Sequence, residues 1–184
     1  MASYRLVAFD PGEMTGYAIF EVHPDRPEDT FFVDLGQFHH KDAFEKISEL
    51  VTDETAVVVV EDYRVFHHKA KAHSGSKLIT TRVIGSMEYR TQQVKARMVQ
   101  QPSNILPIAQ KWSGITLGGN HAQSHQFSAV NHGFFYLVKQ KHAITNLERK
   151  KIQKASASQT QPEVPPRSSL SAEDIDSFLD QELG

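Results

Sequence analysis

The first forty residues alternate short apolar runs with polar turns, which predicts three β-strands. Apolar, aromatic and β-branched residues fill positions 4–9, 15–22 and 31–38. The first connection contains Asp-Pro-Gly and the second contains two prolines, so each one is expected to be a turn or a loop. Because two short connections join the three strands, we expect these strands to be antiparallel.

Helices and strands are predicted to alternate after this point. Apolar residues at helical spacing predict helices over 42–51, 77–97 and 121–144. The unbroken apolar run 55–60 predicts a strand that is buried on both faces, as in a sheet that helices cover on both sides. A short strand is expected over 98–101. The order of these elements predicts an α/β fold.

The composition changes near residue 155, which suggests that one domain spans 1–154. Residues 155–170 are rich in Ser, Gln and Pro and predict a flexible linker. The segment 171–184 is acidic and places Ile175, Phe178, Leu179 and Leu183 on one helical stripe. Three interpretations stay open: a motif that becomes helical in the groove of a protein partner, a segment that folds back on a basic surface, or an unstructured end.

Composition excludes several classes of function. The chain has 184 residues and no cysteine, which excludes disulfide scaffolds, thiolate zinc sites and cysteine nucleophiles. No apolar run approaches the roughly 20 residues that span a bilayer, so no membrane association is expected. The N-terminus does not resemble a signal peptide, and a cytoplasmic protein is the expectation.

The formal net charge of −2 hides three blocks of opposite sign. Residues 1–62 carry a net charge of −10, residues 63–155 carry +13, and residues 156–184 carry −5. Seven of the ten histidines also lie in the middle block. This block predicts binding of a polyanion such as nucleic acid, unless it is a solvated surface that the acidic first block neutralises.

Two carboxylates follow two different predicted strands, and they are the first candidates for a site. Asp10 ends the first strand and Glu61 ends the run 55–60. Carboxylates at the mouths of adjacent strands converge and repel each other unless a cation such as Mg²⁺ or Mn²⁺ neutralises them. Each could instead be a strand-end residue that faces water. Strand alternation puts Glu61 and Asp62 on opposite sides, so only one of them can face Asp10.

The sequence around these acids resembles the RuvC-like Holliday-junction resolvases, a branch of the RNase H-like nucleases. Residues 7–18, Val-Ala-Phe-Asp-Pro-Gly-Glu-Met-Thr-Gly-Tyr-Ala, are similar to the first motif of that family. Residues 57–61 resemble its second motif, and residues 82–88 resemble the helix that follows. The resemblance covers residues 4 to about 140 and is closest to the short bacteriophage members.

The resemblance implies an RNase H-like fold, with a five-stranded mixed sheet and helices on both faces. It implies a metal-dependent endonuclease that resolves branched DNA as a homodimer, in the host cytoplasm if the chain is viral. Asp10 and Glu61 would then hold two Mg²⁺ or Mn²⁺ ions at the scissile phosphate.

The third motif of the family departs from the pattern in this chain. The matching stretch 125–132 reads His-Gln-Phe-Ser-Ala-Val-Asn-His, with Ser128 where the family has an acid. His125, Ser128 and His132 fall on one helical face. His125 is the expected third metal ligand, and His125 or His132 the expected catalytic base. The alternatives are an attenuated site, or a catalytically impaired DNA-binding protein on the same fold. A nuclease for RNA–DNA hybrids fits the first motif less well.

Aromatic and basic residues follow Glu61 directly and predict a DNA-binding segment. Rings can stack on bases while lysines bind phosphates. An ordinary basic loop is the alternative. The candidates are Tyr63, Phe66, His67, His68, Lys69, Lys71 and Lys77.

Overall fold

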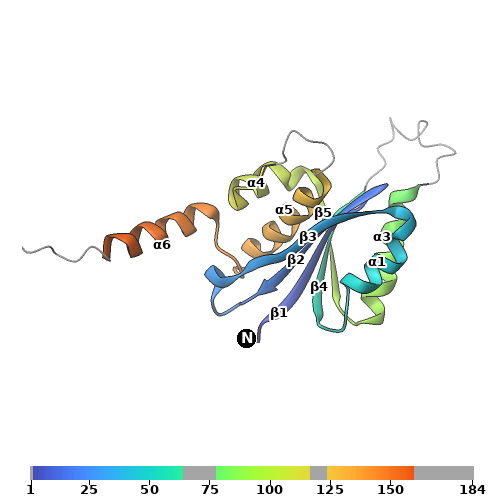
Figure 1. Cartoon of the computed structure of the whole chain (residues 1–184), viewed down its shortest axis with the longest axis horizontal. Helices are drawn as coiled ribbons and strands as arrows, with labels where there is room; N and C mark the ends of the chain where they lie inside the picture. Colours follow the sequence, from blue (N-terminus) through green and yellow to red (C-terminus); the bar gives the residue numbers. More distant parts are fainter. Residues whose placement is uncertain (1, 64–77, 117–123, 160–184) are drawn as a thin grey trace, which may run out of the picture. The chain divides into compact units, whose positions relative to one another are not determined.

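The computed structural model describes residues 2–63, 78–116 and 124–159. Its centre is a five-stranded mixed sheet, which can be followed in Figure 1. The strand order is β3-β2-β1-β4-β5. The β1–β2 and β2–β3 pairs are antiparallel, whereas the β1–β4 and β4–β5 pairs are parallel. The predicted sheet and its antiparallel start are confirmed. The strands are β1 (Tyr4–Asp10), β2 (Met14–Val22), β3 (Phe31–His39), β4 (Thr55–Asp62) and β5 (Arg97–Pro102).

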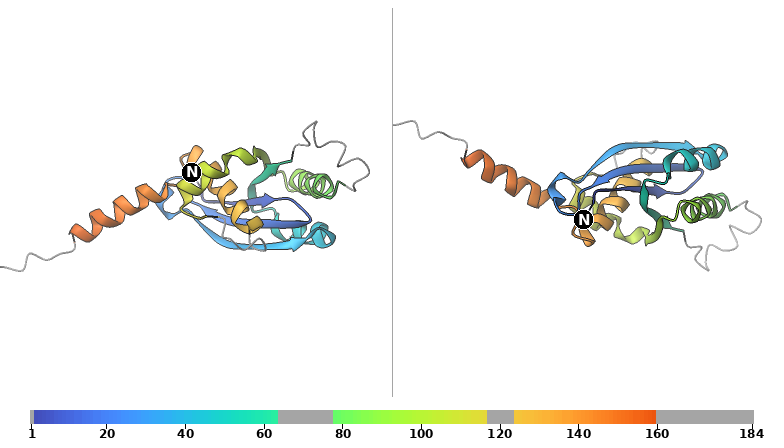
Figure 2. Two further views of the ribbon diagram at one scale, coloured as in Figure 1. Left: turned by 90° about the horizontal axis from the view of Figure 1, so that it is seen from above. Right: turned by 90° about the horizontal axis from the view of Figure 1, so that it is seen from below.

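Helices cover both faces of the sheet, as predicted (Figure 2). One face packs against α1 (Ala43–Leu50) and α3 (Ile79–Gln93), and the other against α5 (Ser124–Lys139). A further helix, α4 (Leu106–Ser113), packs against α5. No helix among the described residues is long and apolar enough to cross a membrane. Short 3₁₀ helices lie at η1 (Pro27–Asp29), η2 (His40–Asp42) and η4 (Ser103–Ile105).

The chain divides into two units, Met1–Lys150 and Lys151–Gly184. The sheet and α1 to α5 belong to the first unit. A last helix, α6 (Asn146–Gln159), runs five residues into the segment expected to be a linker. Alanines and long polar side chains favour a helix there, and the first proline comes only at Pro162. The remainder of that linker and the tail segment 171–184 lie outside the described residues.

Alternating burial along the strands builds one core on each face of the sheet. In β1, Leu6 and Ala8 pack on the α5 side, whereas Val7 and Phe9 pack toward α1 and α3. β4 alternates in the same way, with Val57 and Val59 facing α5, and Val58 and Val60 facing α1 and α3. All eight side chains are buried. The predicted burial of the run 55–60 on both faces is therefore confirmed.

The same alternation places the two candidate carboxylates on one face. Phe9 of β1 pairs with Val60 of β4 in the parallel ladder, so Asp10 and Glu61 come next on neighbouring strands. Asp10 follows Ala8, and Glu61 follows Val59, on the side that α5 covers. Asp62 falls on the opposite side.

The helices α3 and α5 both end earlier than the apolar spacing predicts, and each ends in the same type of turn. Lys95 and Lys141 adopt left-handed backbone conformations, with φ of 57° and 62°. After α3, the Ala96 amide donates to the Thr91 carbonyl at 3.0 Å. After α5, the His142 amide donates to the Leu137 carbonyl at 2.8 Å. These bonds are typical of the Schellman motif, which usually has glycine at the left-handed position.

Candidate functional site

The turn after β1 is held by its own threonine. The Thr15 hydroxyl donates to the Gly12 carbonyl at 3.2 Å and accepts from the Gly12 amide at 3.3 Å. Thr15 is fully buried, so water does not compete for these bonds. The Asp-Pro-Gly and Thr-Gly pairs of the first motif are thus two halves of one turn, which fixes the backbone directly after Asp10.

Gly16 lets helix α5 approach this turn. A β-carbon at Gly16 would lie 2.1 Å from both the carbonyl carbon and the carbonyl oxygen of His125. It would lie 2.5 Å from the backbone nitrogen of Gln126. No real β-carbon comes this close to backbone atoms, so only glycine fits between β2 and the first turn of α5. This contact seats the helix beside Asp10.

Three polar side chains end neighbouring strands at this edge of the sheet. Asp10 ends β1, Glu61 lies near the end of β4, and Gln101 pairs with Glu61 in the ladder between β4 and β5. The polar face of α5 lies across these strand ends, because α5 packs against β1, β2 and β4. His125, Ser128 and His132 come from that face.

One of these histidines binds Asp10. His125 Nδ1 lies 3.0 Å from Asp10 Oδ2. The His125 side chain is 40% exposed, whereas that of Asp10 is 15% exposed. The pair therefore lies at the mouth of the site, where a ligand from solvent can reach the imidazole.

The second pair is deeper and has more partners. His132 Nε2 lies 3.2 Å from Glu61 Oε2, and the Ser128 hydroxyl donates to the same oxygen at 3.3 Å. The other nitrogen of His132, Nδ1, lies 3.1 Å from Gln101 Oε1. The His132 ring is completely buried. His132 therefore orients Glu61 and has no direct contact with solvent.

Burial and mutual repulsion set the charges of the two carboxyls. Burial is the main cause that raises the pKa of Asp10, and the charge of Glu61 raises it further against the opposing effect of His125. Burial would also raise the pKa of Glu61, but hydrogen bonds and charge from His132, with bonds from Asp10 and Ser128, bring it below its usual value. The hydrogen bond to Asp10 is the main cause that raises the pKa of His125, while burial opposes it. Glu61 is thus the anion of the pair, and Asp10 is the acid that resists ionisation.

The donor set fits a hard divalent cation, although no three of these residues form a ready ligand triad. Carboxylate oxygens are the ligands that Mg²⁺ and Mn²⁺ prefer, and the repulsion that raises the pKa of Asp10 is what a cation relieves. No three of Asp10, Glu61, His125 and His132 bring one ligand atom each within 4.8 Å of one another. Each histidine instead contacts one carboxylate. The role of His125 as a third metal ligand stays a prediction.

The predicted DNA-binding segment falls mostly outside the described residues. Tyr63, which directly follows β4, is half-buried at the same edge as the carboxylates. The other candidates lie in the undescribed stretch 64–77. They are Phe66, His67, His68, Lys69, Lys71 and Lys77.

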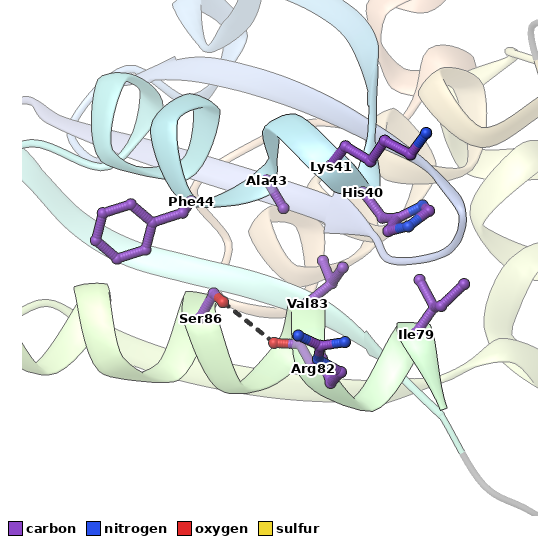
Figure 3. A pocket seen from close by; sticks show the side chains of 8 residues that line it. All are labelled: His40, Lys41, Ala43, Phe44, Ile79, Arg82, Val83 and Ser86. Atoms are coloured by element: carbon purple, nitrogen blue, oxygen red, sulfur yellow. Dashed lines mark hydrogen bonds between the residues drawn. The ribbon is translucent and has the colours of Figure 1, made fainter. Parts of the chain in front are cut away.

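A groove of about 380 Å³ lies away from the carboxylates, between the start of α1 and α3 (Figure 3). Lys41 and Arg82 line it from opposite sides, beside Phe44, which is 70% exposed. Its lining includes none of the candidate catalytic residues. Phe44 is exposed although its spacing from the buried Ile47 and Val51 is that of one helical face.

Two polar residues of the site region escaped the sequence analysis. Gln101 contacts His132, and only the register between β4 and β5 reveals its position. Asn131 is fully buried and accepts from the Ser113 hydroxyl at 2.6 Å. Its amide also donates to the Phe127 and Ile115 carbonyls, which ties the end of α4 to α5. The sequence signal for Asn131 is an asparagine within a mostly apolar helical stretch.

Comparison with known proteins places the fold. The chain matches no protein-family model and no curated protein. The Thermus thermophilus RuvC structure is similar with a TM-score of 0.50 and 10% identity, over 77% of this chain and 99% of RuvC. The Fowlpox virus resolvase, solved with Holliday junction DNA, is similar with a TM-score of 0.53 and 13% identity, over 73% of this chain and 97% of the resolvase. The protein thus has the RNase H-like α/β fold of junction resolvases, which confirms the predicted fold class.

Proposed function

We propose that the protein is a divalent-metal-dependent endonuclease that cleaves branched DNA. The observation that carries this proposal is the convergence of Asp10 and Glu61 from adjacent strands, on the face that α5 covers. Similarity to a resolvase solved with Holliday junction DNA supports the class of substrate. The block of net charge +13 over 63–155 supports a polyanionic ligand.

Asp10 and Glu61 would hold the cation, Mg²⁺ or Mn²⁺, and the resemblance implies two such ions. When bound, such ions activate water and stabilise the leaving oxygen of a phosphodiester. The protein itself orients the two carboxylates and, at Glu61, favours the ionised form. His132, held by Gln101, fixes Glu61 Oε2, and Ser128 adds a second donor to that oxygen.

His125 is the group that can exchange protons with solvent at the mouth of the site. Its contact with Asp10 raises its pKa, so it holds a proton beside the carboxylates over a wider pH range than an ordinary histidine. Because His132 is buried, we assign it the role of positioning Glu61, whereas the partly exposed His125 fits a role in proton transfer. Because a four-way junction offers two equivalent strands, we propose that two copies of the chain act together.

A second candidate function is DNA binding without cleavage. Ser128 favours it, because a neutral hydroxyl hydrogen-bonded to Glu61 stands where the family has a carboxylate. A cation held by two carboxylates is bound more weakly than one held by three. The two candidates differ in cleavage, and both predict preferential binding of branched DNA.

Cleavage of synthetic DNA tests the proposal. Four-way junctions, linear duplexes and RNA–DNA hybrids are incubated with the full chain across titrations of Mg²⁺ and Mn²⁺. The proposal predicts metal-dependent cuts in the junction at concentrations that leave the other two intact. Junction binding with no cleavage in either metal would favour the second candidate, and equal cleavage of all three would contradict the preference for branched DNA.

A further inference from the structure

We propose that Glu13, His39 and His40 form a second metal site, for a transition metal such as Zn²⁺. One ring nitrogen of each histidine and one carboxylate oxygen of Glu13 all lie within 4.8 Å of one another. No other group of three such ligands occurs among the described residues. This site is separate from the proposed function and does not depend on it.

The backbone already holds the three ligands together. Glu13 belongs to the turn between β1 and β2, while His39 ends β3 and His40 opens η2. The His40 amide donates to the Glu13 carbonyl at 2.8 Å, and the next residue, Met14, pairs with His39 in the sheet. A metal ion would therefore join ligands whose main chains are fixed, which lowers the entropic cost of ordering the site.

The side chains face one another across this junction. The His39 and His40 ring centroids are 4.2 Å apart, and His39 Nε2 lies 3.8 Å from a Glu13 carboxylate oxygen. That separation is too long for a hydrogen bond, but a metal ion between the two atoms would have ligand distances of about 2 Å to each. Metal binding through Nε2 would displace the long 3.3 Å contact that His39 Nδ1 accepts from the Lys41 amide.

The His40 ring supplies independent support. Its Nδ1 atom is buried and has no hydrogen-bond partner among the described residues. A buried polar atom without a partner is unfavourable, and most such atoms in native proteins are satisfied by protein, water or an ion. The ring also lines the groove between α1 and α3 (Figure 3), so solvent approaches it from that side.

The ligand types separate this site from the carboxylate site. Imidazole nitrogens suit Zn²⁺, Ni²⁺ and Cu²⁺, whereas carboxylate-rich sites suit Mg²⁺ and Mn²⁺. Two histidines and one glutamate make a three-ligand set that zinc proteins use, with a fourth position left for water. A bound ion would clamp the turn that follows Asp10 to the start of α1.

Titration of the full chain with Co²⁺, a spectroscopic substitute for Zn²⁺, tests the site. After chelator treatment, at a pH where ordinary histidine is neutral, the wild type should develop visible absorption at one equivalent, and Zn²⁺ should remove it. Glu13→Gln and His39→Gln should each weaken binding about tenfold or more. Glu13 has a 72% exposed side chain, so its variant keeps the fold.

Two control variants locate the ion. His23→Gln removes a histidine from another loop, and Asp10→Asn removes a proposed ligand of the separate carboxylate site; both should develop the same visible Co²⁺ absorption at one equivalent as the wild type does. Absence of Co²⁺ binding by the wild type would overturn the proposal. Unchanged absorption in Glu13→Gln, or loss of the absorption in Asp10→Asn, would also overturn it, because the absorbing ion would then be bound elsewhere.

Discussion

Replacing Gly16 by alanine should push helix α5 away from the sheet and disconnect His125 from Asp10. The new β-carbon would lie 2.1 Å from backbone atoms of His125, whereas ordinary contacts begin near 3.4 Å. The helix start or β2 must therefore move by about 1.3 Å. Neither neighbour is a flexible side chain, so the strain cannot be relieved by a rotamer change. Overpacking of this kind costs roughly 1–3 kcal/mol.

Urea unfolding measures this cost, and Gly85→Ala provides the matched control. Gly85 lies inside α3, and a β-carbon there meets no atom within 4 Å. Alanine at that position should stabilise the protein by roughly 0.5–1 kcal/mol, because it favours the helix. Gly16→Ala should lower the unfolding midpoint, and His125 should lose the Asp10 contact that raises its pKa, as an NMR titration of the imidazole would show. If Gly16→Ala matches the wild type in both measurements, the close approach of α5 to β2 is wrong.

Two further predictions concern the carboxylate site. Because the pKa of Asp10 is raised above its ordinary value of 3.8, its ionisation destabilises the metal-free folded state as pH rises through that raised pKa. Asp10→Asn should therefore melt at a higher temperature than the wild type in EDTA at pH about 7.5, and this difference should shrink as the pH falls toward the ordinary pKa of an aspartate. A variant that melts below the wild type at pH about 7.5 would contradict the raised pKa of Asp10. Ser128→Asp should melt at a lower temperature than the wild type without metal, because it adds a buried charge beside Glu61. Added Mg²⁺ should raise the melting temperature of this variant more than that of the wild type. If calorimetry shows unchanged Mg²⁺ affinity, position 128 does not belong to the metal site.

The sheet was predictable because its signals are local. Val57 to Val60 form an apolar run that has few other solutions, and Asp-Pro-Gly marks the first turn without ambiguity. Strand alternation predicts that Glu61 and Asp62 lie on opposite sides, so only one of them can face Asp10. The choice of Glu61 came from the family resemblance, and the register between β1 and β4 puts it on the same face as Asp10.

The ends of α3 and α5, and the helices α4 and α6, could not be predicted from such local signals. Lys95 and Lys141 take left-handed positions where glycine is the usual marker, so apolar spacing alone extended both helices too far. α4 lies in a stretch that the sequence left unassigned, and α6 has too few apolar residues to show a buried face. Tertiary contacts, such as the Ser113–Asn131 bond, determine where α4 lies.

The candidate site was predictable only as a set of residue types. The spacing of His125, Ser128 and His132 showed that they share a face of α5, but not which carboxylate each contacts. Pairing of His125 with Asp10 and of His132 with Glu61 depends on how α5 crosses the sheet, which Gly16 controls. Gln101 enters the site through the register of β5.

Cleavage of a four-way DNA junction by carboxylate variants tests the central claim most directly. Asp10→Asn and Glu61→Gln each remove one proposed metal ligand, while Asp62→Asn changes the adjacent carboxylate on the opposite side of the strand. The account predicts metal-dependent cleavage by the wild type and by Asp62→Asn, and none by Asp10→Asn or Glu61→Gln, with junction binding kept in all four. Cleavage that survives in Asp10→Asn or Glu61→Gln, or that disappears only in Asp62→Asn, would contradict the assignment of the active site.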